Sequence, residues 1–132
     1  MIVGIGVDVV HVRRLDRWME IPGLPERYFH PEELSSALSR GRGAALSLAA
    51  RFAAKEAFGK ALGIGLAGIV LKDIMVSNSH NGQPEMTLFG TALAALRKNG
   101  ADRIHISLTH EDDNAIAMVV LESFSESPEK KI

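Results

Sequence analysis

Four residues combine a reactive side chain with a position that favours chemistry. Asp8 lies within the apolar run MIVGIGVDVV, where a carboxylate is costly to bury unless it is paired or bound to a metal. Glu56 and Lys60 lie four residues apart in the alanine-rich stretch RFAAKEAFGKALG, and His110 ends the alternating segment IHISLTH. Each of the four also has an ordinary structural explanation.

The glycines before Asp8 allow the backbone to approach a neighbouring group closely. Gly4 and Gly6 carry no Cβ, which suits a bound phosphate or cofactor. Asp8 could equally cap the helix expected to follow it, and its position alone does not separate the two explanations. The pattern is a weak signal by itself, because GIGVD lacks the glycine spacing of a dinucleotide-binding loop.

Glu56 and Lys60 fall on one face of the helix expected around them, because residues four apart are neighbours. For a helix chosen at random, we would prefer an ordinary ion pair worth about 0.2–0.5 kcal/mol. Gly59 weakens that preference, since glycine costs about 1 kcal/mol of helix stability relative to alanine and indicates close packing or an approaching ligand.

His110 and Thr109 stand where an expected strand passes into a turn. A histidine there could bind phosphate or transfer a proton near neutral pH, or it could simply bond to the turn backbone. His105, Ser107 and Thr109 share one strand face, which is more often only the wetter side of a sheet.

Taken together, these residues indicate phosphoryl-group chemistry that uses magnesium. Mg²⁺ keeps several waters and is typically held by one or two carboxylates plus substrate phosphates, which fits Asp8 and Glu56 better than zinc would. Lys60, one helical turn from Glu56, could meet a phosphate that the same ion bridges.

Length and composition limit the class of protein. The chain has 132 residues, 46% of them hydrophobic and 23% charged, as expected of one ordinary globular domain. A net charge of -1 favours neither nucleic acid nor a membrane surface as partner. The absence of cysteine excludes disulfides, thiolate zinc sites and cysteine nucleophiles. The N-terminus is unlike a signal peptide, and no apolar stretch approaches the roughly 20 residues of a membrane-spanning helix, so we expect a cytoplasmic protein.

The helices and strands that the sequence predicts around these residues indicate an α+β fold. The patterns predict a domain over residues 1–122 and a polar tail over 123–132. The predicted elements are a strand over 2–10 that ends near Asp8, a helix over 11–20, a short helix from Pro31, a long helix over 44–62, a hairpin of strands within 69–78 and 84–89, a helix over 91–98, and a hairpin of strands over 103–109 and 115–121.

Three blocks of the sequence follow one another in a family-like order: GIGVDVVHVRR, RFAAKEAFGKALG and IHISLTH before an apolar strand. Together they resemble the holo-[acyl-carrier-protein] synthases, the short trimeric type of the 4'-phosphopantetheinyl transferase superfamily. The resemblance covers residues 1–122, and the three ordered blocks are far more specific than any one of them.

The resemblance implies a 4'-phosphopantetheinyl transferase-like fold, in which an antiparallel sheet packs against one long and several short helices. It implies transfer of 4'-phosphopantetheine from coenzyme A to a serine of apo acyl carrier protein, with release of adenosine 3',5'-bisphosphate, in fatty acid biosynthesis. The implied cofactor is Mg²⁺ and the implied co-substrate is coenzyme A. The implied assembly is a homotrimer with active sites between subunits.

The resemblance also implies roles for single residues. Asp8 and Glu56 would bind Mg²⁺ together with the coenzyme A pyrophosphate. The sequence does not choose among a metal-bound water, Glu56 and His110 as the group that takes the serine proton. The implied catalytic residues are Glu56, Lys60 and His110, and the implied coenzyme A contacts are Arg51, Lys60, Thr109 and His110.

Arginines near the start offer a contact for the acyl carrier protein, which usually presents an acidic helix. We expect Arg14 and Arg17 to make this contact, whereas Arg13 is more simply a solvated residue. The segment over residues 38–45, which contains Arg40 and Arg42, could be a mobile lid or a phosphate contact.

Two other functions compete with the transferase. A magnesium-dependent nuclease with a ribonuclease-H-like sheet also begins with a strand bearing an aspartate, but it needs further carboxylates, and the near-neutral charge disfavours nucleic acid. The aspartates Asp73, Asp102, Asp112 and Asp113 do not stand in such a context. A non-catalytic carrier-binding module would keep the fold without the chemistry, and it should have lost at least one of Asp8, Glu56, Lys60 and His110.

Overall fold

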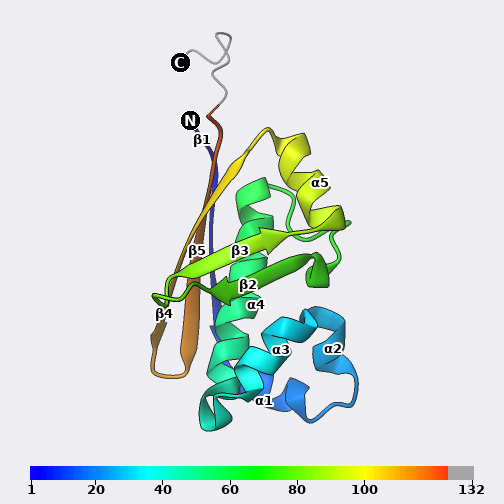
Figure 1. The fold of residues 1–132 in the computed structure, drawn as a ribbon, viewed down its shortest axis with the longest axis vertical. Helices are drawn as coiled ribbons and strands as arrows, with labels where there is room; N and C mark the ends of the chain where they lie inside the picture. The colour runs from blue at the N-terminus through cyan, green and yellow to red at the C-terminus, as the bar shows by residue number, and fades with distance from the viewer. Residues whose placement is uncertain (125–132) are drawn as a thin grey trace.

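The computed structural model describes residues 1–124, which form helices and antiparallel strands (Figure 1). In chain order the elements are β1 (Ile2–His11), α1 (Val12–Met19), α2 (Leu24–Tyr28), α3 (Pro31–Leu38), the 3₁₀ turn η1 (Gly41–Gly43), α4 (Ala44–Leu62), the 3₁₀ turn η2 (Leu71–Asp73), β2 (Ile74–Asn78), β3 (Pro84–Leu88), α5 (Gly90–Asn99), β4 (Arg103–Glu111) and β5 (Asn114–Glu122). The predicted α+β class is confirmed.

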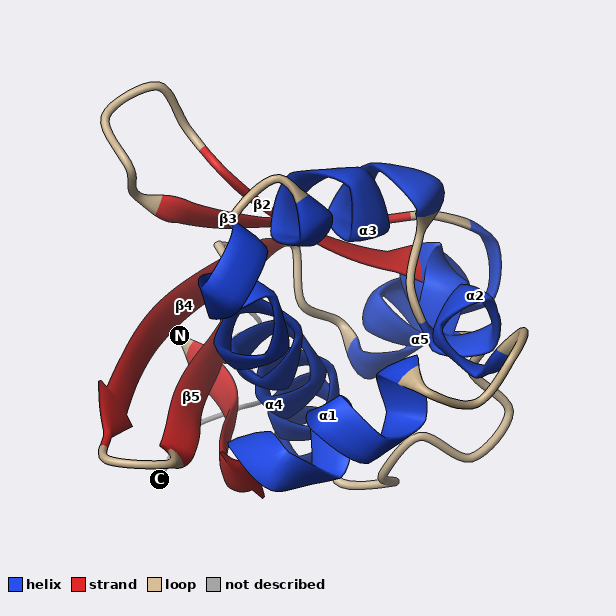
Figure 2. Cartoon of the chain, turned by 90° about the horizontal axis from the view of Figure 1, so that it is seen from below, coloured by secondary structure: helices blue, strands red, loops and turns tan. Residues whose placement is uncertain are grey.

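The strands form two antiparallel sheets around the long helix α4. One sheet has the order β1-β5-β4, and β2 and β3 make a separate hairpin. Seen along α4, the larger sheet lies on one side, and the shorter helices and the β2–β3 hairpin surround the rest (Figure 2). In the register of the larger sheet, Asp8 is paired with Ala117 and Ala117 with Leu108. Paired residues on neighbouring strands point to the same face of a sheet, so Asp8, Ala117 and Leu108 share one face. Ala117 is fully buried, so this is the face that packs against α4.

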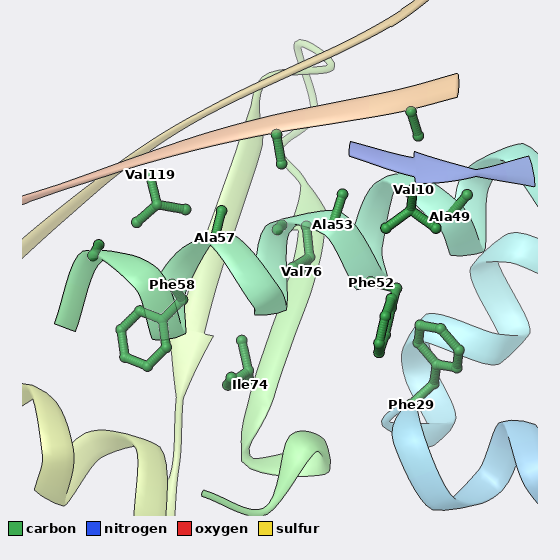
Figure 3. Packing of buried hydrophobic residues seen from close by; sticks show 14 of the residues in the cluster. Val10, Phe29, Ala49, Phe52, Ala53, Ala57, Phe58, Ile74, Val76 and Val119 are labelled. Atoms are coloured by element: carbon green, nitrogen blue, oxygen red, sulfur yellow. The ribbon is translucent and has the colours of Figure 1, made fainter. Parts of the chain in front are cut away.

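The core forms where α4 meets the sheet. Ala49, Ala53 and Ala57 recur every four residues on the helix face that meets the strands, whereas Phe52 and Phe58 point to the other side (Figure 3). On β5, Ala117 and Val119 alternate with more exposed neighbours. The helix is thus buried almost all round, so short side chains are needed where it touches the sheet.

A buried ion pair joins α4 to the helices and strand around it. Lys55 Nζ donates to Glu33 Oε1 at 2.6 Å, and both side chains are fully buried. The same ammonium donates to the carbonyl oxygens of Tyr28 at 2.9 Å and Leu71 at 3.0 Å. The other oxygen of Glu33 accepts the backbone N–H of Val76 at 3.0 Å. The pair therefore connects α2, α3, η2 and β2 to the helix that carries Glu56.

The sequence prediction that the first strand ends near Asp8 was wrong. β1 continues to His11. It is an edge strand whose backbone hydrogen bonds to β5 continue past Asp8, whatever the polarity of that side chain. Asp8 therefore does not cap α1; the His11 side chain accepts the N–H of Arg13 instead. The short helix α2 was not predicted.

The ends of the described chain are tied to each other. The amino group of Met1 donates to the carbonyl oxygen of Ser123 at 2.6 Å, and the Ser123 N–H donates back to Met1. Phe124 N–H bonds to the Asp102 carboxylate at 3.2 Å. The rest of the predicted tail, residues 125–132, lies outside the described residues.

Candidate functional site

Asp8, Glu56 and Lys60 meet where β1 crosses α4. Lys60 Nζ donates to Asp8 Oδ1 at 2.8 Å and to the carbonyl oxygen of Val7 at 3.0 Å. The crossing can be this close because Gly6 has no side chain: a Cβ there would stand 1.9 Å from the carbonyl oxygen of Ala57. The glycine before Asp8 thus brings the strand carboxylate to the helix.

Glu56 faces the same corner between β1 and α4, close enough for the negative charge of Asp8 to act on its carboxylate. Its pKa is raised, first by burial and then by the negative charge of Asp8, while Arg14 and Lys60 act in the opposite direction. The carboxylates of Asp8 and Glu56 face each other at this corner, and together they form a site that attracts a cation. In this structure the Lys60 ammonium supplies part of that charge.

The residues present fit Mg²⁺ held with the help of a substrate. Among residues 1–124 no group of three or more His, Cys, Asp or Glu side chains could hold a metal ion. Two carboxylates match the way Mg²⁺ binds when phosphates and waters complete its coordination, and they do not match a closed zinc site. Asp8 and Glu56 would be the protein ligands.

Arg14 stands beside the carboxylates, held over aromatic rings. Its guanidinium carbon lies 5.1 Å from the Trp18 ring centre and 5.2 Å from that of Phe52. Arg14 and Arg17 line an open groove along α1 together with Trp18 and Ile21. This groove combines positive charge with apolar surface, next to Glu56.

Arg51, Thr109 and His110 line a different cavity, between the start of α4, β2 and the end of β4. The cavity has a volume of about 400 Å³. Its lining is Arg40, Gly43, Leu46, Ser47, Ala50, Arg51, Val76, Asn78, Leu108, Thr109 and His110. Two residues of the 38–45 segment therefore form part of its wall: Gly43 in the turn η1, and Arg40 just before that turn.

Arg51 is buried, with 4% of its surface exposed. Its Nε donates to the carbonyl oxygen of Val76 at 3.1 Å, and its terminal nitrogens bond to Ser47 and to the hydroxyl of Ser36. Most of its donors are thus used inside the protein, where they join α4 to α3 and β2.

The two groups of predicted residues lie on opposite sides of α4. Arg51 and Lys60 are nine positions apart, which places them roughly 180° from each other at about 100° per residue. On the sheet, Asp8 is on β1 and His110 on β4, with β5 between them. One chain thus brings Asp8, Glu56, Lys60 and Arg14 together and keeps Arg51, Thr109 and His110 apart from them.

The match to a known family covers most of this fold. The family described as the 4'-phosphopantetheinyl transferase superfamily matches residues 4–119, a range that contains both groups of site residues. The chain belongs to this superfamily. Its membership removes the basis for the nuclease alternative.

The relatives are similar over nearly their whole length. A holo-[acyl-carrier-protein] synthase of Treponema denticola is 58% identical over 122 residues, which span 92% of this chain and 99% of the relative. The crystal structure of holo-[acyl-carrier-protein] synthase from Neisseria meningitidis has a TM-score of 0.82 at 36% identity and covers 93% of this chain and 100% of that one. A Bacillus anthracis holo-(acyl-carrier-protein) synthase in complex with coenzyme A (3',5'-ADP) has a TM-score of 0.78 at 33% identity over 93% of this chain and 98% of that one.

Sequence reasoning missed the pair Glu33–Lys55, although both residues stand in patterns that it used. Glu33 lies in the first turn of the short helix predicted from Pro31, where it completes a capping box with His30. Lys55 offered one signal, a lysine within a run of alanine and phenylalanine. Its partner is 22 residues away, so no local spacing could reveal the pair.

Proposed function

We propose that this protein transfers the 4'-phosphopantetheine group of coenzyme A to a serine of apo acyl carrier protein, with Mg²⁺ as cofactor. The observation that carries the proposal is the corner formed by Asp8, Glu56 and Lys60 in a chain of this superfamily. The relatives named holo-[acyl-carrier-protein] synthase support the same reaction.

The residues of the corner would act by binding and orienting charge. Bound Mg²⁺ would neutralise charge on the pyrophosphate and fix its position, which is the main requirement of phosphoryl transfer. Asp8 and Glu56 would hold the ion, and Lys60 would contact a phosphate oxygen. Arg14 and Arg17 would bind the acidic face of the carrier protein beside Glu56, which brings the serine to the phosphate.

The cavity on the other side of α4 would hold coenzyme A through Arg51, Thr109 and His110 of a second subunit. This arrangement requires an oligomer, and we propose a homotrimer. A sheet face supports it: β1 and β5 expose apolar side chains on the surface opposite α4, and Ile5, Val7 and Val9 are each more than half exposed. Apolar patches of this kind on a soluble protein mark an interface.

The cellular setting proposed is the cytoplasm, with fatty acid biosynthesis as the use of the product. Among residues 1–124, the structure contains no helix long and apolar enough to cross a membrane. The substrates, coenzyme A and an acyl carrier protein, would be met there.

The reaction is tested by intact-mass spectrometry of apo acyl carrier protein incubated with the protein, coenzyme A and Mg²⁺. We expect the carrier protein to gain one phosphopantetheine group, and we expect neither a chelated reaction nor Glu56→Ala to produce this gain. Carrier protein that binds tightly and never gains mass would instead establish the non-catalytic module.

A further inference from the structure

Lys60 occupies the place beside Asp8 where a bound cation would neutralise that carboxylate. Its Nζ bonds both to Asp8 Oδ1 and to the carbonyl oxygen of Val7. The side chain of Lys60 is 54% exposed whereas that of Asp8 is 18% exposed, so the ammonium can leave into solvent without any change in the backbone.

The corner holds more negative charge than Lys60 neutralises. The Lys60 ammonium bonds to Asp8, and the Glu56 carboxylate lies one helical turn away on the same face of α4. The Lys60 ammonium therefore bonds to one of two neighbouring carboxylates, while Arg14 and Lys60 both act on Glu56 through space. A divalent cation bound to both would balance them fully, and it would repel the ammonium from Asp8.

We infer that Lys60 is a displaceable internal counter-ion of Asp8. A divalent cation that binds Asp8 and Glu56 expels the Lys60 ammonium, and the freed ammonium becomes a ligand for a phosphate of the incoming substrate. The identity of that phosphate rests on the proposed function. The exchange makes ion binding and phosphate binding depend on each other through a side chain of the protein, in addition to any direct contact between ion and phosphate.

Removal of Lys60 should therefore have two effects of opposite sign. Without coenzyme A, Lys60→Gln should bind the ion about two- to five-fold more tightly than the wild type, because a half-exposed ion pair no longer has to be broken. With coenzyme A, the variant lacks the freed ammonium, so coenzyme A should strengthen ion binding less than it does in the wild type. Linkage requires the same reduction in the effect of the ion on coenzyme A affinity.

The experiment measures Mn²⁺ binding to the full chain, from the electron paramagnetic resonance signal of the free ion, with and without coenzyme A. Arg14→Gln is the matched control. It also removes one positive charge that acts on Glu56, but among residues 1–124 Arg14 forms no ion pair with Asp8. The control therefore measures the general effect of charge, and any further tightening in Lys60→Gln measures the displacement.

The expected result is tighter Mn²⁺ binding by Lys60→Gln than by both other proteins without coenzyme A, and a smaller gain on its addition. Equal binding by wild type and Lys60→Gln, an equal shift in Arg14→Gln, or no Mn²⁺ binding by Lys60→Gln without coenzyme A would each overturn the inference. If the wild type modifies carrier protein while the Lys60→Gln shift is absent, only the exchange is wrong. If the shift is present without carrier modification, only the proposed function is wrong.

Discussion

Gly6 decides how closely β1 can approach α4, and with it the position of Asp8. An added Cβ would lie 1.9 Å from the Ala57 carbonyl oxygen and 2.7 Å from the Ala61 nitrogen, both of them backbone atoms. Backbone cannot move aside as a side chain can, so the strand itself must shift. We therefore expect Gly6→Ala to reduce the free energy of unfolding by about 3 kcal/mol, the upper end for overpacked cores.

Urea unfolding of Gly6→Ala and Gly43→Ala checks this expectation. Gly43 is the matched control, because its φ of -83° suits alanine and the nearest atom to an added Cβ is Arg40 Cβ at 3.6 Å. The change at Gly43 should stay within about 1 kcal/mol. Equal losses in the two variants would show that the contact with α4 is not what Gly6 provides.

Lys55 lies next to Glu56 in sequence but serves the interior. Lys55→Met leaves the Glu33 carboxylate buried without its ion pair, which should cost about 3–5 kcal/mol of unfolding free energy. The same substitution in a Glu33→Gln background should cost much less, because no buried charge is left alone. Urea unfolding of the four proteins gives the coupling directly, and purely additive losses would contradict this account.

Among the elements, α5 depends on a residue outside itself for its N-terminal cap. Asp73 of η2 accepts hydrogen bonds from the Thr91 N–H at 2.8 Å and from the Thr91 hydroxyl at 2.6 Å. The helix has no side-chain cap of its own, since Phe89 stands at the cap position. We expect Asp73→Ala to lower the free energy of unfolding by about 0.5–2 kcal/mol at neutral pH, as for other lost N-caps.

The contribution of Asp73 should disappear in acid. The bonds from Thr91 hold the pKa of Asp73 below its ordinary value of 3.8 in the folded protein. A carboxyl with a depressed folded-state pKa stabilises fully above its unfolded pKa and loses that effect as the pH falls through the folded-state pKa. Denaturation at a series of pH values should therefore show the wild type and Asp73→Ala converging below pH 3.8. A difference that stays constant with pH would assign the loss to packing.

The elements that could be predicted from the sequence are those long enough to show a hydrophobic period. The hairpin of β4 and β5 and the long helix α4 were found because alternation and helical spacing reflect which face each element buries. The helix α2 was missed because LPERY is only five residues long and its apolar pattern is too short to have a period. The end of β1 was misplaced because polarity at Asp8 was taken for a boundary, although an edge strand next to a lysine accommodates a carboxylate.

The sequence indicated which residues could form the site, but it predicted only part of their arrangement in space. Helical spacing brought Glu56 and Lys60 to one face, and the structure adds Asp8 to them through Gly6. The same spacing places Arg51 on the far side of α4 from Lys60. Contacts set by tertiary packing alone, such as Lys55 with Glu33, were beyond reach of any local pattern.

At the scale of the whole molecule, the separation of Asp8 from His110 makes a test of assembly possible. If each active site takes its carboxylates from one subunit and its cavity from the next, Asp8→Asn and His110→Ala damage different halves of a site. Co-expressed in one cell, the two inactive chains should form mixed oligomers in which some sites receive two intact halves. With random mixing in a head-to-tail ring, about a quarter of the sites should be restored.

Carrier-protein modification by the purified mixed oligomers measures this restoration, and Asp8→Asn co-expressed with Glu56→Gln is the control. Those two substitutions fall in the same half, so no arrangement of subunits can rebuild a site from them. Activity near a quarter of wild type for the first pair and none for the second would establish shared sites. Inactivity of both pairs, with oligomers formed, would mean that each chain closes its own site and that α4 does not separate two half-sites.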